Sequence, residues 1–322
     1  MDKEVKREDF MVKKQIGKNG IVELFRFLCS IWVAYFHGFF PVRSDNFSGV
    51  NISIDFFFMV SGIFFIKSME KYKEKSFRDA FKHITWDKTK GFIVPLGIAA
   101  LSILCCNILF ELEFNRFNWP LSFLWFFVAQ FAYLSLIFVI FKHTKRRSTF
   151  NIICFIILCI TMSFCIFDSE TLGRVLRGPG MLAMGIFISQ IPKVKFELEN
   201  KVKAERLALI LNIVGFVVSA ATFIYLAYLP EYAIWKLHIF ICLVCPAFLY
   251  FATALPVKGK IFNLLGELSI FVYLAQCPIL LHFYAGTRVS TDYFGWLCFY
   301  TVLLFTINRI VNKINSKKKL FA

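Results

Sequence analysis

Arg26 and His37 are ionisable residues in the first long apolar stretch of this sequence, and eleven positions separate them. At about 100° per residue, an α-helix brings residues with this spacing back to nearly the same face, roughly 16 Å apart along the axis. Ionisable side chains are costly in a lipid-spanning helix and usually serve a function there. The stretch is therefore expected to carry a permanent cation and a titratable imidazole on one face.

Asp55 belongs to the second apolar stretch, in the segment Asp55-Phe-Phe-Phe-Met-Val-Ser61-Gly62. If both stretches are helices joined by a short loop, Asp55 and His37 lie at comparable depths. A carboxylate can orient an imidazole and stabilise its cation, and neutral imidazole suits a general base that accepts a hydroxyl proton. The alternative for Asp55 is a carboxylate that offsets the dipole at a helix N-terminus.

Long apolar runs dominate the chain, which is 58% hydrophobic over 322 residues and contains 42 phenylalanines. Runs of roughly 17 to 25 residues match the thickness of a bilayer, so the fold class is an all-α polytopic membrane protein with about ten transmembrane helices. The expected spans are Ile21–Phe40, Val50–Ile66, Gly91–Phe110, Trp119–Phe141, Phe150–Phe167, Gly178–Ile191, Leu207–Tyr228, Ala233–Leu255, Ile261–Tyr284 and Tyr293–Val311.

The basic residues predict how these helices are oriented. Most of the 37 lysines and arginines fall in alternate connections, and the positive-inside rule places those connections and both termini in the cytoplasm. The formal net charge of +16 is then a topology signal, with attraction to anionic lipid and no need for nucleic acid. The expected cytoplasmic segments are 1–20, 67–90, 142–149, 193–206, 258–260 and 313–322.

The division of the chain follows from this topology. Residues 1–20 form a basic cytoplasmic segment without the features of a signal peptide, 21–312 form the transmembrane domain, and 313–322 form a basic cytoplasmic tail. The ten cysteines lie almost all within apolar runs, and the Cys242-x-x-Cys245 motif has no second pair. These cysteines are expected to be small apolar filler, without disulfide bonds or a metal site. A multi-pass protein of the cytoplasmic (inner) membrane is expected.

An arginine, ten residues and a histidine in the first helix, followed by Asp-Phe-Phe-Phe-x-x-Ser-Gly in the second, resembles the membrane acyltransferase family 3. Enzymes of this family move acyl groups, often acetyl from acetyl-CoA, onto hydroxyls of glycans and related acceptors. The resemblance implies an acyl-CoA donor, for which Arg26 could bind a CoA phosphate or a carbonyl of the pantetheine arm. Lys88 and Lys90, shortly before Pro95, are similar to the family's basic residues ahead of the third helix and imply ligands for CoA phosphate.

Three later segments also resemble the family: Leu124-Trp125-Phe126, Arg177-Gly178 to Gly185, and Leu265-Gly266 through Tyr273 and Gln276 to Pro278. The resemblance implies substrate-binding roles for Trp125, Arg177, Tyr273 and Gln276. Many members have a histidine where this chain has Gln276, and glutamine forms hydrogen bonds but does not shuttle a proton at neutral pH. His37 therefore remains the main candidate for the base.

These observations predict an integral membrane O-acyltransferase that transfers an acyl group, such as acetyl, from acyl-CoA to a glycan or lipid-linked saccharide. His37 and Asp55 are the expected catalytic residues. The alternative is a transporter or flippase of a lipid-linked glycan that uses the same charged residues as a translocation path. An inverted repeat between the two halves would favour that alternative, and none is evident in the sequence.

Overall fold

The computed structural model describes residues 19–39, 47–86, 93–109, 125–144, 146–166, 170–196, 200–228, 238–284 and 291–318. Within these ranges some side chains, such as those of 36–39 and 47–51, lie outside the described part. All regular secondary structure in the described residues is helical, as the long apolar runs predict.

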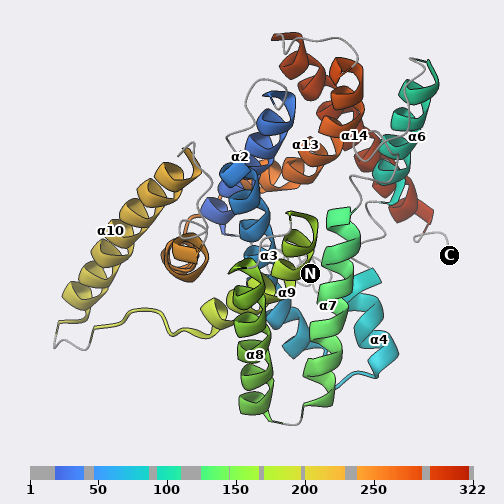
Figure 1. The fold of residues 1–322 in the computed structure, drawn as a ribbon. Coiled ribbons are helices and arrows are strands. Elements are labelled where there is room, and N and C mark those ends of the chain that lie inside the picture. Colours follow the sequence, from blue (N-terminus) through green and yellow to red (C-terminus); the bar gives the residue numbers. More distant parts are fainter. Residues whose placement is uncertain are drawn as a thin grey trace, which may run out of the picture.

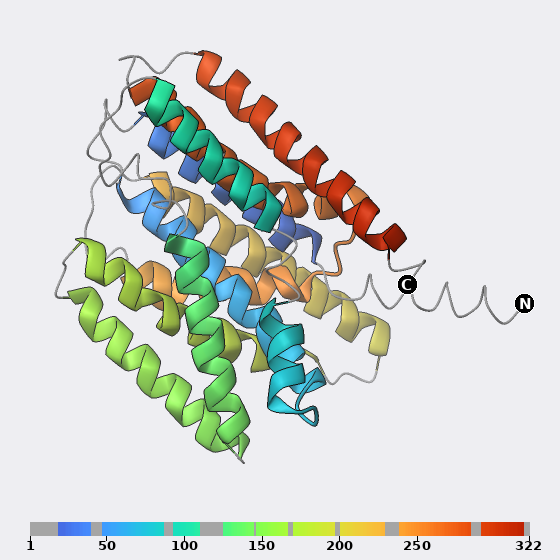
Figure 2. The ribbon, with the colours of Figure 1, turned by 90° about the vertical axis from the view of Figure 1, so that its right-hand side faces the viewer.

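Long helices lie side by side in one bundle (Figures 1 and 2). They are α2 (Gly20–Phe39), α3 (Phe47–Lys71), α6 (Ile93–Leu109), α7 (Trp125–His143), α8 (Arg147–Ile166), α9 (Glu170–Gln190), α10 (Lys201–Tyr228), α12 (Cys245–Ala254), α13 (Lys260–Tyr284) and α14 (Thr291–Lys318). A short helix α4 (Phe77–Phe81) and a π-helical turn η1 (Lys82–Trp86) follow α3, and a second π-helical turn η4 (Phe240–Val244) leads into α12.

Each expected span overlaps one of the long helices, but several helix ends differ from the ends of the spans. Helix α3 continues to Lys71, α9 already begins at Glu170, and α14 extends to Lys318 through most of the expected tail. Hydropathy marks where a helix leaves an apolar environment, whereas charged residues at that border can continue the same helix. The helices therefore extend beyond the predicted apolar spans at these ends, and the membrane boundaries themselves stay a prediction.

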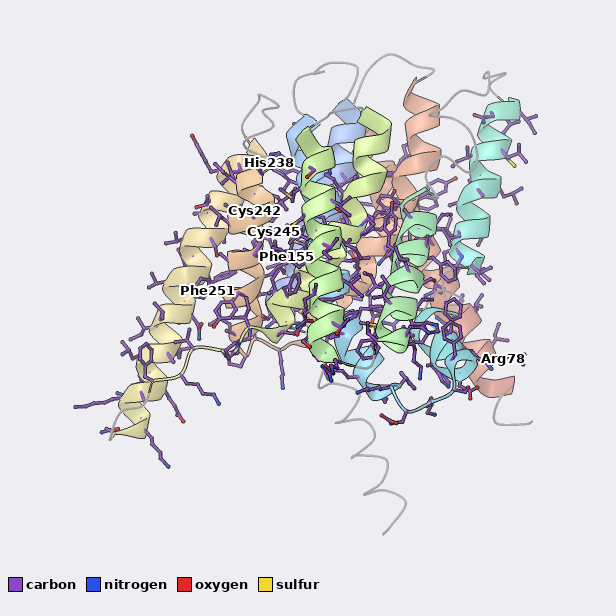
Figure 3. The ribbon with its side chains drawn as sticks, turned by 60° about the horizontal axis from the view of Figure 1, so that its bottom comes forward. Arg78, Phe155, His238, Cys242, Cys245 and Phe251 are labelled. Carbon is purple, nitrogen blue, oxygen red and sulfur yellow. The ribbon has the colours of Figure 1, made fainter. Side chains whose placement is uncertain are left out.

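Two helix pairs form the centre of the bundle. Helix α13 packs along α2, and α9 packs along α3. Helix α8 packs on α9. Helices α6 and α14 both lie against α13. Helix α10 lies at one side of the bundle, against α12 and α3 (Figure 1). In Figure 3, Phe251 and Cys245 lie on α12 beside α10. The Phe251 ring packs so closely on Gly215 of α10 that a Cβ atom there would overlap it.

A cluster of aromatic side chains joins α2, α3, α10 and α12. The ring centroids of Phe25 and Phe248 are 4.4 Å apart, and those of Phe56 and Phe223 are 5.8 Å apart in an edge-to-face arrangement. Aromatic pairs of this geometry contribute roughly 0.5–1.5 kcal/mol each beyond the burial of their area. The many phenylalanines of the sequence thus account for much of the helix packing.

Helices α3 and α9 approach each other at Gly62 and Gly185. A Cβ atom at Gly62 would overlap the backbone oxygen of Leu182, and one at Gly185 would overlap the backbone oxygen of Met59. Small residues let helix backbones approach closely inside a membrane, where van der Waals packing replaces the hydrophobic effect between helices. This contact holds the two helices in a fixed register.

The outer helices expose large apolar side chains, among them Ile108, Val128, Phe155, Val218 and Val302. Exposed apolar surface of this extent belongs in lipid. By length and composition, four of the helices in the described part of the chain could cross a membrane: Ile52–Lys71, Phe126–His143, Lys201–Leu226 and Phe294–Ile314. The protein is therefore a multi-pass membrane protein, while the number of ten spans stays a prediction.

Polar contacts join several of the expected cytoplasmic segments at one end of the bundle. Lys142 Nζ donates to the backbone oxygens of Lys73 and Lys75, each at 2.6 Å. Arg147 forms a salt bridge with Glu70 at 3.1 Å. These cations satisfy backbone carbonyls and acids where α3 ends and α7 turns into α8.

The same end includes the start of α2. Asn19 Oδ1 accepts the backbone N–H of Ile21 and Val22, which caps α2, while Asn19 Nδ2 donates to the oxygens of Ala252 and Leu255 at the end of α12. Lys193 Nζ donates to the backbone oxygen of Tyr250 in α12 at 3.0 Å. Which membrane face this end occupies remains a prediction from the positive-inside rule.

Candidate active site

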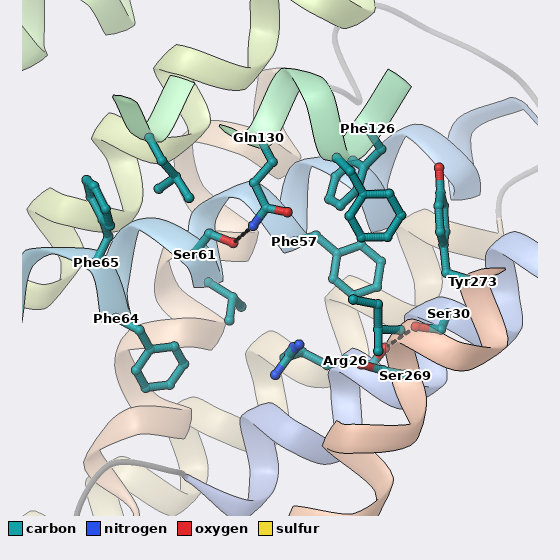
Figure 4. A pocket seen from close by; sticks show the side chains of 14 residues that line it. Arg26, Ser30, Phe57, Ser61, Phe64, Phe65, Phe126, Gln130, Ser269 and Tyr273 are labelled. Atoms are coloured by element: carbon teal, nitrogen blue, oxygen red, sulfur yellow. Dashed lines mark hydrogen bonds between the residues drawn. The ribbon is translucent and has the colours of Figure 1, made fainter. Parts of the chain in front are cut away.

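A cavity of about 250 Å³ lies between α2, α3, α7 and α13 (Figure 4). Its wall combines aromatic rings and aliphatic side chains with a few polar groups, which is the usual make-up of a small-molecule site. The residues that line it are Arg26, Ser30, Phe57, Val60, Ser61, Phe64, Phe65, Phe126, Phe127, Gln130, Leu134, Ser269, Ile270 and Tyr273.

Arg26 is the charged group of this cavity wall. Its Nη1 donates to Glu23 Oε2 at 2.9 Å, one helical turn earlier in α2. The Glu23 side chain is 2% exposed, whereas that of Arg26 is 30% exposed and points into the cavity in Figure 4. Glu23 lies so close to Gly266 of α13 that a Cβ atom there would overlap its carboxylate. Glycine at 266 thus makes room for the acid that holds Arg26.

Gln130 and Ser61 bring a second polar group to the cavity. Gln130 Nε2 donates to Ser61 Oγ at 2.7 Å and joins α7 to α3. This bond uses one of the two N–H hydrogens of the amide, so its second N–H and its oxygen can serve a ligand. Ser61, which precedes Gly62 in the Asp55 motif, therefore lines the cavity.

Two serines lie on the facing helices near Arg26. Ser30 Oγ donates to the backbone oxygen of Arg26 at 2.9 Å, and Ser269 Oγ donates to that of Gly266 at 2.8 Å. Their hydrogens are used within their own helices, and the two residues are only 1% and 2% exposed. Tyr273 follows Ser269 by one turn along α13 and also lines the cavity, while its expected role in substrate binding stays a prediction.

Helix α2 continues without a break from Gly20 to Phe39. Positions 26, 30 and 37 therefore fall on one stripe of the helix, as the eleven-residue spacing predicts. The side chain of His37 lies outside the described residues, and its role stays a prediction. On α13, Gln276 stands one turn beyond Tyr273, is 2% exposed, and its Oε1 accepts no hydrogen bond from the described part of the chain.

Asp55 and Arg177 meet in the bundle rather than at the cavity. The Arg177 Nε and Asp55 Oδ1 atoms are 3.4 Å apart, and the side chains are 5% and 1% exposed. Asp55 lies on the face of α3 that carries Met59 and Gly62 towards α9, whereas the cavity takes the opposite face with Phe57 and Phe64. The structure thus joins two residues that the sequence assigned to separate roles.

Three other predicted site residues have side chains outside the described part of the chain. Lys88 and Lys90 lie outside the described residues, and Trp125 is the first residue of α7, with its side chain outside the described part. Sequence reasoning gave no role to Glu23 or Gln130. Both carried a signal, because a carboxylate three positions before Arg26 and an amide inside an apolar run are costly in lipid unless they have partners.

The helical bundle and this cavity define a membrane protein that buries a polar, partly ionic pocket between its helices. A comparison with models of protein families matches residues 19–310 to a model described as an acyltransferase domain. The match spans most of the chain, and the protein belongs to acyltransferase family 3. Comparisons with curated proteins and with solved structures gave no match.

Proposed function

We propose that this protein is an O-acyltransferase of the cytoplasmic membrane that moves an acyl group, such as acetyl, from acyl-CoA to a hydroxyl of a cell-envelope glycan. Family membership supports acyl transfer in general. The observation that carries the finer proposal is the cavity on the Arg26 stripe of α2, which offers a guanidinium, an amide and a ring-lined wall within the bundle.

The proposed reaction needs one proton acceptor and one activated carbonyl. His37 takes the proton of the acceptor hydroxyl as its oxygen attacks the thioester carbon. The C–O bond forms, the C–S bond breaks, and the leaving thiolate takes up the proton to give free CoA. Arg26, with its remaining N–H groups directed at the cavity, donates hydrogen bonds to a donor carbonyl and so holds the thioester arm.

Asp55 and Arg177 have a supporting place in this proposal. The ion pair fixes α9 against α3, and α3 supplies one wall of the cavity. An orienting contact from Asp55 to His37 remains a prediction, and so do phosphate binding by Lys88 and Lys90 and substrate binding by Trp125, Arg177, Tyr273 and Gln276.

The test is transfer of radiolabelled acetyl from acetyl-CoA to glycan in membranes that contain the protein, with protein amount measured by immunoblot. We expect label that mild alkali releases from the glycan, because O-esters are base-labile and amides are not. Membranes without the protein are the control. Movement of a lipid-linked glycan across the bilayer without acylation would support the transporter and contradict the proposal.

A further inference from the structure

The charge of Arg26 is compensated inside the protein. Glu23 lies directly behind the guanidinium at 2.9 Å and is almost completely buried. Among the described residues that line the cavity, Arg26 is the one ionised side chain, so this described lining and Glu23 together carry no net charge. A group of this kind directs hydrogen bonds into the cavity without an excess of positive charge.

We propose that this cavity binds the uncharged thioester and amide arm of the donor, that the phosphates of the donor stay outside it, and that Glu23 is the positioning residue that sets this selectivity. The proposal rests on the proposed function and deepens it. It decides between the two partners that the sequence allows for Arg26, a phosphate and a carbonyl, in favour of the carbonyl.

Charge and solvation support this choice. A phosphate group that enters a ring-lined, neutral cavity loses its hydration and gains no net opposite charge there. A thioester or amide carbonyl has a much smaller desolvation cost and accepts a hydrogen bond from Arg26 without a need for excess charge. The buried carboxylate of Glu23 thus works against an anionic ligand at the same place.

The remaining polar groups suit an amide chain. Gln130 retains a donor and an acceptor beside Ser61. Ser30 and Ser269 also line the cavity, but they are almost completely buried. The rings of Phe57 and Phe126 supply apolar walls between these groups. An arm of alternating methylene and amide units matches this alternation of apolar and polar surface.

The size of the cavity points to part of a donor rather than a whole coenzyme. Its volume of about 250 Å³ lies below the roughly 300–1,000 Å³ of pockets that hold drug-sized ligands. The volume is thus sufficient for a narrow arm but small for a whole coenzyme, and we assign the described cavity to the arm.

The experiment compares acetyl-CoA with S-acetyl-pantetheine, a donor that has the same arm and no phosphate. Wild-type transfer from acetyl-CoA is measured first, since its absence from membranes that contain the protein contradicts the proposed function itself. Arg26→Gln should then raise KM by about 10- to 100-fold, by the same factor for both donors, because one charge-assisted hydrogen bond to the arm is lost. A loss seen with acetyl-CoA alone would assign Arg26 to a phosphate and overturn the inference.

Glu23 has its own readout. Glu23→Gln leaves Arg26 with a net positive charge, so inorganic phosphate should become a competitor against S-acetyl-pantetheine, whereas it should not compete in the wild type. Glu23→Asp should restore the resistance to phosphate. Equal phosphate inhibition of the wild type and Glu23→Gln would contradict a selective role for Glu23.

Each single glutamine variant leaves the charge of Glu23 or Arg26 without its partner, which can prevent folding. Two further variants avoid this problem. The double variant Glu23→Gln/Arg26→Gln removes both charges, and Gln130→Leu removes the amide; each should raise KM equally for the two donors. The matched control is the exposed pair of Arg309 and Glu267, 2.7 Å apart, whose variants should leave both KM values unchanged. A wild-type protein that neither uses nor is inhibited by S-acetyl-pantetheine would overturn the proposal.

Discussion

Asp55 of α3 and Arg177 of α9 form a buried ion pair, with Oδ1 and Nε 3.4 Å apart. The pair lies on the same face of α3 as Gly62, whose backbone nearly touches that of α9. A close backbone contact and an ionic contact thus join the same two helices about two turns apart. Since α3 also lines the cavity, its contacts with α9 determine the position of one cavity wall.

Asp55→Asn should destabilise the protein by about 3–5 kcal/mol, because it removes the carboxylate charge from beside a buried guanidinium. Arg177→Gln should cost a similar amount, and the double variant should recover part of the loss. Thermal unfolding of the purified protein in detergent measures the effect. The exposed pair offers a control: Glu267→Gln should cost less than about 1 kcal/mol. Equal costs at both pairs would contradict this account.

Gly62→Ala and Gly185→Ala should each lower the amount of folded protein and its unfolding temperature. The added methyl group would overlap a backbone oxygen of the partner helix, and a backbone cannot move aside as a flexible side chain can. Gly97→Ala and Gly295→Ala are matched helical controls, because a Cβ atom at either meets no atom of the described residues within 4 Å. These controls should be neutral or more stable by up to about 1 kcal/mol. Equal decreases in the unfolding temperature of all four variants would contradict a special role for the close contact between α3 and α9.

Most of the fold could be predicted from the sequence because a bilayer requires long apolar helices, and hydropathy detects them directly. The start of α9 could not be predicted in this way. Residues 170–177 are polar and contain Arg174 and Arg177, so hydropathy assigned them to a loop. Their helical state depends on tertiary partners such as Asp55, which no local pattern reveals.

The candidate site was predictable in part. The spacing of Arg26 and His37 correctly placed positions of α2 on one stripe, and Arg26 and Tyr273 do line one cavity. The salt bridge of Arg26 with Glu23 was not predicted. The Glu23 carboxylate occupies the place that a side chain at Gly266 would take, and Gly266 lies more than 200 residues later in the sequence. Likewise, contact of Gln130 with Ser61 requires the α7–α3 packing, which hydropathy does not determine.

The topology is open to direct measurement. The contacts of Lys142 with the α3–α4 connection and of Asn19 with α12 place several basic segments at one end of the bundle. Under the positive-inside rule this end faces the cytoplasm. Reporter fusions at 142–149 and at the C-terminus should therefore report a cytoplasmic location, and fusions at 168–169 an external one. A C-terminal reporter found outside would contradict ten spans with both ends inside.

His37→Ala should lower acyl transfer by about 10²- to 10⁴-fold at normal protein levels, the usual range for loss of a general base. Activity of the wild type should fall towards acidic pH, because a protonated imidazole cannot accept the hydroxyl proton. The residual activity of His37→Ala should lack this dependence. The exposed His143 at the end of α7 is the matched control, and His143→Ala should transfer acetyl at the wild-type rate.

A double-mutant comparison decides whether Asp55 also acts through His37. If Asp55 orients the imidazole, Asp55→Asn should cost less activity per folded molecule than His37→Ala, and the double variant should be no worse than His37→Ala alone. If Asp55 acts only through its pair with Arg177, the loss should appear in the amount of folded protein and should be shared by Arg177→Gln. Losses of specific activity that multiply in the double variant would break the proposed His37–Asp55 pair, while full activity of His37→Ala would remove His37 as the base.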